Sequence, residues 1–161
     1  MQHIRIKFLF MDVDGTLTDG KLHISSAGES FKSFYARDGY GIRYILPQYG
    51  ITPVIITGRS SEIVSYRAEE LGIQAVYQNI ADKAGCVREI AATYQLSSAE
   101  MAYIGDDLND LPAMELCGVR GCPVDAVSAV KKICGYVCIN PGGGGAVREF
   151  IDWLCSMESL V

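Results

Sequence analysis

With 161 residues, the chain is long enough to bury a substantial core and short enough to form one domain. Its formal charge of −5, from 14 basic and 19 acidic side chains, argues against binding to nucleic acid or to an acidic membrane surface. No segment approaches the roughly 18 apolar residues of a membrane helix. Arg5 and Lys7 interrupt the first apolar run, which therefore does not look like a signal peptide, and we expect a cytoplasmic protein.

Short apolar segments predict the strands of a buried sheet: 4–11, 51–57, 73–77, 101–105 and, more weakly, 136–140. Several are apolar throughout, as parallel strands are when helices cover both faces of a sheet. Two sets of apolar residues between and after them recur at helical spacing: Val87, Ile90, Ala91 and Tyr94, then Val147, Phe150, Ile151 and Leu154. Because strand and helix alternate, we predict one α/β domain over residues 1–161, with a doubly wound, Rossmann-like, mostly parallel sheet.

Residues 17–34 interrupt this alternation. They contain two short extended pieces around the sequence SSAG, which predicts a β-hairpin inserted after the first strand. A helix should follow from about Gly39 and stop near Leu46, since Pro47 cannot continue it without a kink. The six cysteines show no CxxC pair, and we expect them to be buried, reduced thiols.

Polar residues follow four of the predicted strands, one group after each strand. Ligands of doubly wound folds bind at the carboxyl ends of the strands, so these residues should converge at one edge. They are Asp12 and Asp14, then Thr57, Gly58 and Arg59, then Lys83 at a helix start, and finally Asp106 and Asp107. This convergence is the strongest functional indication in the sequence.

Asp12 and Asp14 are two residues apart, so an extended backbone would direct both carboxylates to the same side. Like charges this close repel each other unless a cation lies between them. Asp106 would add a third carboxylate from a neighbouring strand. Oxygen ligands of this kind suit a hard divalent cation, and we predict Mg²⁺.

Anion-binding features accompany the predicted cation site. Gly58 exposes backbone N–H groups at a helix start, where anions bind, although an ordinary helix cap by Ser60 or Ser61 fits the sequence equally well. Lys83 falls in the first turn of its helix, in line with the buried face. A cation there opposes the helix dipole, so Lys83 is better explained if it faces an anion.

The sequences DVDGT, TGR, Lys83 and GDDLND, in this order and spacing, resemble the four motifs of the haloacid dehalogenase superfamily of phosphohydrolases. The resemblance implies that Asp12 attacks phosphorus to form an aspartyl-phosphate and that Asp14 serves as general acid and base. It also implies that Mg²⁺ is held by Asp12, Asp106 and the backbone carbonyl of Asp14. Thr57 and Lys83 would stabilise the transferring phosphoryl group.

The gaps between these motifs are too short for the cap domain that many members of the superfamily use to cover small substrates. The substrate is therefore either macromolecular, or a neighbouring subunit supplies the lid. The second option is favoured by a closer resemblance, carried by DGKL, by GE-x-x-K-x-F (Gly28, Glu29, Lys32, Phe34), by RDGYGIR and by GAVREF. These sequences resemble the capless, tetrameric branch that hydrolyses 3-deoxy-D-manno-octulosonate 8-phosphate for lipopolysaccharide synthesis. In that branch the hairpin, here 17–34, assembles a homotetramer.

By this resemblance, a small phosphorylated sugar acid would contact a defined set of residues: Asp14, Tyr35, Ala36, Arg37, Asp38, Gly39, Arg43, Gly58, Arg59, Arg67, Lys83 and Asn109. Arginine suits such a ligand because its guanidinium binds a carboxylate through two hydrogen bonds. Arg67 follows Arg59 by about two helical turns, so both could line one side of a cleft.

The sequence also fits other substrates and other functions. Related phosphatases acting on nine-carbon keto acids tend to carry an acidic residue at the position of Arg59, which favours the eight-carbon substrate here. The glycine loop of the branch has an arginine where this chain has Gly144, so PGGGG (141–145) could instead be a flexible linker. A capless phosphatase for macromolecular phosphates, or a non-catalytic oligomerising or switch module, are further readings.

Overall fold

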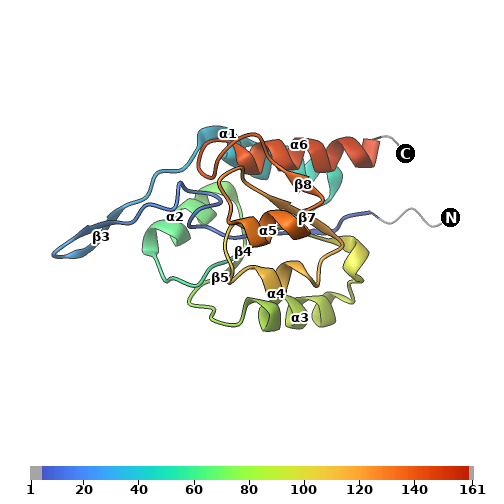
Figure 1. Ribbon diagram of the computed structural model, residues 1–161, viewed down its shortest axis with the longest axis horizontal. Helices are drawn as coiled ribbons and strands as arrows, with labels where there is room; N and C mark the ends of the chain where they lie inside the picture. Colours follow the sequence, from blue (N-terminus) through green and yellow to red (C-terminus); the bar gives the residue numbers. More distant parts are fainter. Residues whose placement is uncertain (1–4, 160–161) are drawn as a thin grey trace.

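The computed structural model describes residues 5–159, so Ile4, at the start of the predicted first strand, lies outside the described part. Its main sheet has six strands in the order β5-β4-β1-β6-β7-β8, and every neighbouring pair is parallel (Figure 1). The strands are β1 Phe8–Met11, β4 Thr52–Ile56, β5 Ala75–Tyr77, β6 Met101–Ile104, β7 Val119–Cys122 and β8 Tyr136–Val137. The predicted doubly wound α/β fold is confirmed.

Helices cover both faces of this sheet, as Figure 1 shows. One face packs against α1 Ala36–Tyr40, a π-helical turn Gly41–Ile45, a 3₁₀ turn Leu46–Tyr49, α2 Glu62–Leu71 and α6 Ala146–Ser159. The other packs against α3 Lys83–Tyr94, α4 Leu111–Met114 and α5 Ser128–Ile133, and a 3₁₀ turn Ser98–Glu100 precedes β6. Side chains of β1 alternate between the two faces, with Leu9 in one cluster and Phe10 in the other.

The central strand β1 is hydrogen-bonded on both sides, to β4 and to β6. All four of its residues are buried, which fits their uniformly apolar sequence FLFM. Just beyond the strand, the N–H of Asp12 still donates to the carbonyl of Ile104 over 3.2 Å. Asp12 therefore leaves the sheet from its most firmly held position.

The predicted hairpin is present as an antiparallel pair, β2 His23–Ser25 and β3 Gly28–Phe31. It projects away from the rest of the chain at the left of Figure 1. The rings of His23 and Phe31 stack across it with centroids 4.0 Å apart. Leu22, Ile24 and Phe31 are exposed along this arm, and Ile24 retains 65% of its accessible surface.

The helical segment before β4 differs from the prediction at both ends. It begins at Ala36 rather than near Gly39, and it continues past Leu46 to Tyr49. Pro47 does not end it, because it occupies the first turn of the 3₁₀ segment, where no N–H is required. The prediction for Pro47 was therefore wrong about where the segment stops.

The six cysteines are free thiols, as expected, and only Cys134 is partly exposed. Within residues 5–159, the longest helices are too short or too polar to cross a bilayer.

Candidate active site

Three of the strand ends meet as the sequence predicts. Asp12 follows the central strand, Thr57 follows β4 on one side, and Asp106 comes shortly after β6 on the other. The strand order reverses at β1, with β4 and β5 on one side of it and β6, β7 and β8 on the other. Doubly wound folds bind ligands at such a switch point. Ligand oxygens of Asp12, Asp106 and Asp110 lie within 4.8 Å of one another.

Lys83 connects two of these carboxylates. Its ammonium lies 2.6 Å from Oδ1 of Asp12 and 2.7 Å from Oδ1 of Asp110, and only 1% of its side chain is exposed. Burial would lower the pKa of Lys83, but the charges of Asp12 and Asp110 outweigh that effect and raise it. The lysine therefore stays charged, facing anions as the sequence predicts.

Asp110 is a site residue that the sequence reasoning missed. Besides Lys83, its Oδ1 accepts the hydroxyl of Tyr103 at 2.8 Å, and its Oδ2 accepts the backbone N–H groups of Asp106 and Asp107. Both oxygens are thus occupied within the chain. The available signal was the third aspartate of GDDLND, four residues after Asp106.

Burial raises the pKa of Asp12 well above its ordinary range, and the charge of Asp110 raises it further, while Lys83 opposes both. Burial also raises the pKa of Asp106 to about 6, although hydrogen bonds from Asp12 and Thr16 lower it. The protein alone thus leaves an excess of negative charge here. The buried carboxylate of Asp12 and the half-buried carboxylate of Asp106 are a donor set that fits a hard divalent cation.

Gly15 makes the close approach of the first loop possible. It has φ +97°, and a Cβ at this position would lie 2.1 Å from Oδ2 of Asp106. Any other residue would push the loop away from Asp106 and would strain its own backbone. This glycine lets the turn after β1 pack directly on the acidic cluster.

Asp14 does not share its partners with Asp12, although the two residues were expected to point to the same side. Its Oδ1 receives a hydrogen bond from Lys32 at 2.6 Å, and its Oδ2 lies 3.9 Å from Nε of Arg59. The chain already turns after Asp12, so the period-2 argument for an extended strand does not apply. The predicted residue Arg59 does reach the site, whereas Lys32 was not predicted to.

The segment after β4 contains the ordinary helix cap, one of the two readings left open by the sequence. Thr57 is buried, while Gly58 and Arg59 are exposed at the strand end. Ser61 caps α2, with its side chain accepting the N–H of Val64. The ordinary cap is therefore present, and it leaves Gly58 open.

The proposed substrate segment divides into exposed and buried parts. Ala36 and Arg37 are exposed at the start of α1, and Tyr35 is partly exposed. Asp38 is only 2% exposed, and its Oδ1 accepts the N–H of Arg148 at the start of α6. Burial raises the pKa of Asp38 to about 6. This carboxyl therefore joins two helices inside the fold, and its contact with substrate stays a prediction.

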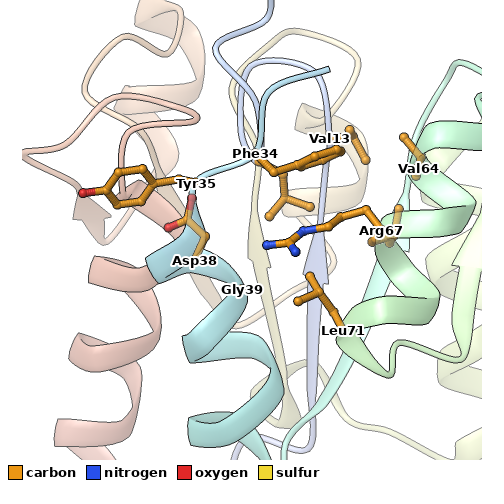
Figure 2. A pocket seen from close by; sticks show the side chains of 10 residues that line it. Val13, Phe34, Tyr35, Asp38, Gly39, Val64, Arg67 and Leu71 are labelled. Atoms are coloured by element: carbon orange, nitrogen blue, oxygen red, sulfur yellow. The ribbon is translucent and has the colours of Figure 1, made fainter. Parts of the chain in front are cut away.

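Two arginines lie elsewhere than expected. In Figure 2 the guanidinium of Arg67 lies between Phe34 and Leu71, above the backbone of Gly39, rather than along an open cleft with Arg59. Its Nη1 pairs with Glu70 at 2.6 Å, and its carbon centre lies 5.7 Å from the Phe34 ring. Gly39 is buried below it, where a Cβ would lie 2.4 Å from Arg67, so this glycine serves packing.

Arg43 lies at the opposite edge of the sheet. Its Nη1 donates to the carbonyl of Glu70 over 2.6 Å, beside Gly72 at the end of α2. Since α2 starts at the site and runs away from it, Arg43 is remote from Asp12. Its contact with substrate stays a prediction, as does that of Asn109, which is exposed in the loop after Asp106.

The glycine loop is not a free linker. The N–H of Gly143 donates to the carbonyl of Thr16, and that of Gly142 donates to Asp125. A Cβ on Gly142 would lie 1.9 Å from the carbonyl oxygen of Gly15. The loop therefore packs backbone to backbone on the turn that carries Asp14.

These features define a class of site: an acidic, cation-binding cluster with a buried lysine at the carboxyl edge of a doubly wound sheet. A family profile described as haloacid dehalogenase-like hydrolase matches residues 72–151, which include Lys83 and Asp106. The chain belongs to this family of hydrolases.

Known phosphatases are similar to this chain, in sequence and in structure, over nearly its whole length. It is 42% identical over 147 residues to 3-deoxy-D-manno-octulosonate 8-phosphate phosphatase KdsC of Yersinia pestis, covering 91% of this chain and 78% of the relative. The cobalt-bound phosphatase structure from Haemophilus influenzae has a TM-score of 0.92 at 37% identity, covering 97% and 91%. A structure of the phosphatase from Moraxella catarrhalis, in complex with magnesium, phosphate and KDO, has a TM-score of 0.89 at 38% identity, covering 94% and 86%.

Proposed function

We propose that this chain is a Mg²⁺-dependent phosphomonoesterase that converts 3-deoxy-D-manno-octulosonate 8-phosphate into the free sugar acid and phosphate. One observation carries the proposal: the buried carboxylate of Asp12, paired with Lys83 and adjacent to Asp106, stands at the end of the central strand. The phosphatases to which the chain is similar support the choice of substrate.

In the first step, a carboxylate oxygen of Asp12 attacks phosphorus, and the bond from phosphorus to the sugar oxygen breaks. The electron pair of that bond passes to the sugar oxygen, which takes a proton from Asp14. In the second step Asp14 removes a proton from water as the water oxygen attacks phosphorus. The bond from phosphorus to Asp12 breaks, which releases phosphate and regenerates the Asp12 carboxylate. Lys83 and Thr57 stabilise charge on the transferring oxygens.

Asp12, Asp106 and the backbone carbonyl of Asp14 would hold the Mg²⁺. When bound, the ion offsets the repulsion between the attacking carboxylate and the phosphate group. Asp110 does not serve as a direct ligand in this proposal, because its oxygens are already bonded to Lys83, Tyr103 and backbone N–H groups.

The exposed residues around this centre are the proposed contacts of the sugar acid. Arg59 lies next to Asp14 and offers a guanidinium to a carboxylate or phosphate. Gly58 and Asn109 lie at the neighbouring strand ends, and the segment from Tyr35 to Arg37 lies at the start of α1. We propose a single domain acting in the cytoplasm, which fits its six free thiols.

A substrate panel tests the proposed activity. We expect 3-deoxy-D-manno-octulosonate 8-phosphate to be hydrolysed with a kcat/KM at least about 100-fold above that of ordinary sugar phosphates, because a missing carboxylate leaves Arg59 unpaired. Activity should disappear when EDTA removes Mg²⁺ and return when the ion is restored. Equal rates across the panel would contradict the proposed substrate specificity. Preference for a nine-carbon keto acid phosphate would identify that compound as the substrate instead.

The projecting hairpin supports a homotetramer as part of the proposal. A two-stranded hairpin is marginally stable by itself, and this one exposes Leu22, Ile24 and Phe31. A second copy of the chain, packing on this arm, would bury these side chains and cover the open site.

We expect the double substitution Ile24→Lys and Phe31→Lys to dissociate the assembly, because it places charges in the proposed interface. Analytical ultracentrifugation would show a shift from tetramer to smaller species, with unchanged far-UV circular dichroism. Lys132→Glu on α5, away from the arm, is a control whose charge change has the same size and the opposite sign. A wild-type monomer at micromolar concentration would contradict the tetramer and favour a macromolecular substrate.

A further inference from the structure

The hairpin also reaches into the site through one buried lysine. Lys32 follows β3, and only 2% of its side chain is exposed. Its ammonium lies 2.6 Å from Oδ1 of Asp14 and 3.0 Å from Oε1 of Glu29. A buried lysine with two carboxylate partners is held in one orientation, unlike a lysine on an open surface.

Glu29 ties this lysine to the rest of the fold. Its Oε2 accepts a hydrogen bond from the hydroxyl of Ser61, the residue that caps α2. The chain of contacts therefore runs from the start of α2 through Glu29 and Lys32 to Asp14. Burial alone would lower the pKa of Lys32, but the bonds to Asp14 and Glu29 outweigh it and raise that pKa.

The two oxygens of Asp14 have different surroundings. Oδ1 is bonded to Lys32, whereas Oδ2 lies 3.9 Å from the half-exposed Arg59, beyond hydrogen-bond range. Only Oδ2 is thus open toward a bound substrate. We propose that Lys32 is a positioning residue that fixes Oδ1 of Asp14, so that Oδ2 is the oxygen that gives the proton to the leaving sugar oxygen and later takes one from water.

The inference rests on the proposed function, because it assigns a task within the same reaction. Asp14 lies in a loop beyond the end of β1, and an exposed carboxylate there would sample several rotamers. A proton donor is effective only when its proton-bearing oxygen is held within hydrogen-bond reach of the leaving group. Lys32 and Glu29 supply that constraint from the hairpin.

Leaving-group dependence tests the proposal. An alkyl phosphate such as the sugar acid phosphate requires protonation of its leaving oxygen, whereas p-nitrophenolate leaves as a stable anion. We expect Lys32→Met to lower kcat/KM for the sugar acid phosphate by about 10- to 100-fold, and for p-nitrophenyl phosphate by less than about 3-fold. Lys32→Arg should recover most of the loss. Lys21→Met, which removes an exposed lysine of the same segment, should change neither value.

Equal losses on both substrates, or no loss on either, would overturn the proposal. If Lys32→Met unfolds, as thermal denaturation would reveal, Glu29→Gln provides the same comparison, because it loosens Lys32 without removing it. A wild-type protein that hydrolyses p-nitrophenyl phosphate but not the sugar acid phosphate refutes the proposed substrate only. The comparison is then made with the best alkyl phosphate of the panel, and a selective loss there supports the role of Lys32.

Discussion

Replacing Asp12 with Asn is expected to lower kcat by at least about 10⁴-fold while the protein stays folded. The amide has nearly the shape of the carboxyl group, but its oxygen is a poor nucleophile toward phosphorus. The fold should tolerate the change, because burial and the charge of Asp110 already disfavour the ionised form of Asp12. Lys83 would keep Asp110 as its second partner at 2.7 Å.

Steady-state kinetics with Mg²⁺ present would measure the loss, and calorimetric titration with substrate would show that binding persists. Asp107→Asn provides a matched control three residues from Asp110, since Asp107 is exposed and its Oδ1 accepts only the N–H of Leu108. This control should retain activity within about 2-fold. Near wild-type turnover by Asp12→Asn would exclude the aspartyl-phosphate route.

Asp110→Asn is expected to destabilise the protein by about 3 kcal/mol and to lower kcat/KM by about 10- to 100-fold. The amide would present N–H groups to the backbone N–H groups of Asp106 and Asp107, which leaves these part-buried donors unpaired. Lys83, which is 1% exposed, would also lose one of its two anionic partners. The lysine that faces the phosphoryl group would then be held less firmly.

Urea denaturation at neutral pH would give the change in the free energy of unfolding. Asp107→Asn is again the control, with an expected change within about 0.5 kcal/mol because its side chain is exposed. Tyr103→Phe removes one smaller contact to the same carboxylate and should cost about 1 kcal/mol. An unchanged midpoint for Asp110→Asn would show that the buried network contributes little to stability.

The centre of the site was predictable because each of its residues follows a recognisable element. Asp12, Thr57 and Asp106 come after apolar runs, and Lys83 starts a helix with a clear apolar period. Parallel strands bring their carboxyl ends to one edge, so the order of elements was enough to gather these side chains. Predicting this gathering required no knowledge of how the helices pack on the sheet.

The strand β7 could not be predicted from its sequence. Val119–Cys122 contains Arg120 and Gly121 within four residues, which gives neither an alternating nor a continuously apolar pattern. Its glycine has a tertiary cause, because a Cβ on Gly121 would lie 2.4 Å from the ring of Phe150. The packing of α6 on the sheet, rather than any local preference, explains this residue.

The positions of Arg67, Arg43 and Asp38 in the fold could not be predicted from the sequence, for a similar reason. Helical spacing does not relate Arg67 to Arg59, because Arg59 precedes α2, which starts only at Glu62. Arg43 and Asp38 lie close to substrate motifs in sequence, yet their positions depend on how α1 packs against α2 and α6. A sequence pattern carries no information on such packing.

The position of β1 in the middle of the sheet has a consequence for local unfolding. Its backbone is bonded to β4 and β6, so these bonds open only when the centre of the domain opens. The strands β2 and β3 form a separate sheet with no backbone ladder to the main one, so in a single subunit the arm can fray while the main sheet stays intact. We therefore expect the backbone N–H of Asp12 to exchange its hydrogen among the slowest in the domain, and those of the arm among the fastest. Asp14, which is bonded to Lys32, lies between these two parts. Transient fraying of the arm would interrupt proton transfer without disturbing the nucleophile.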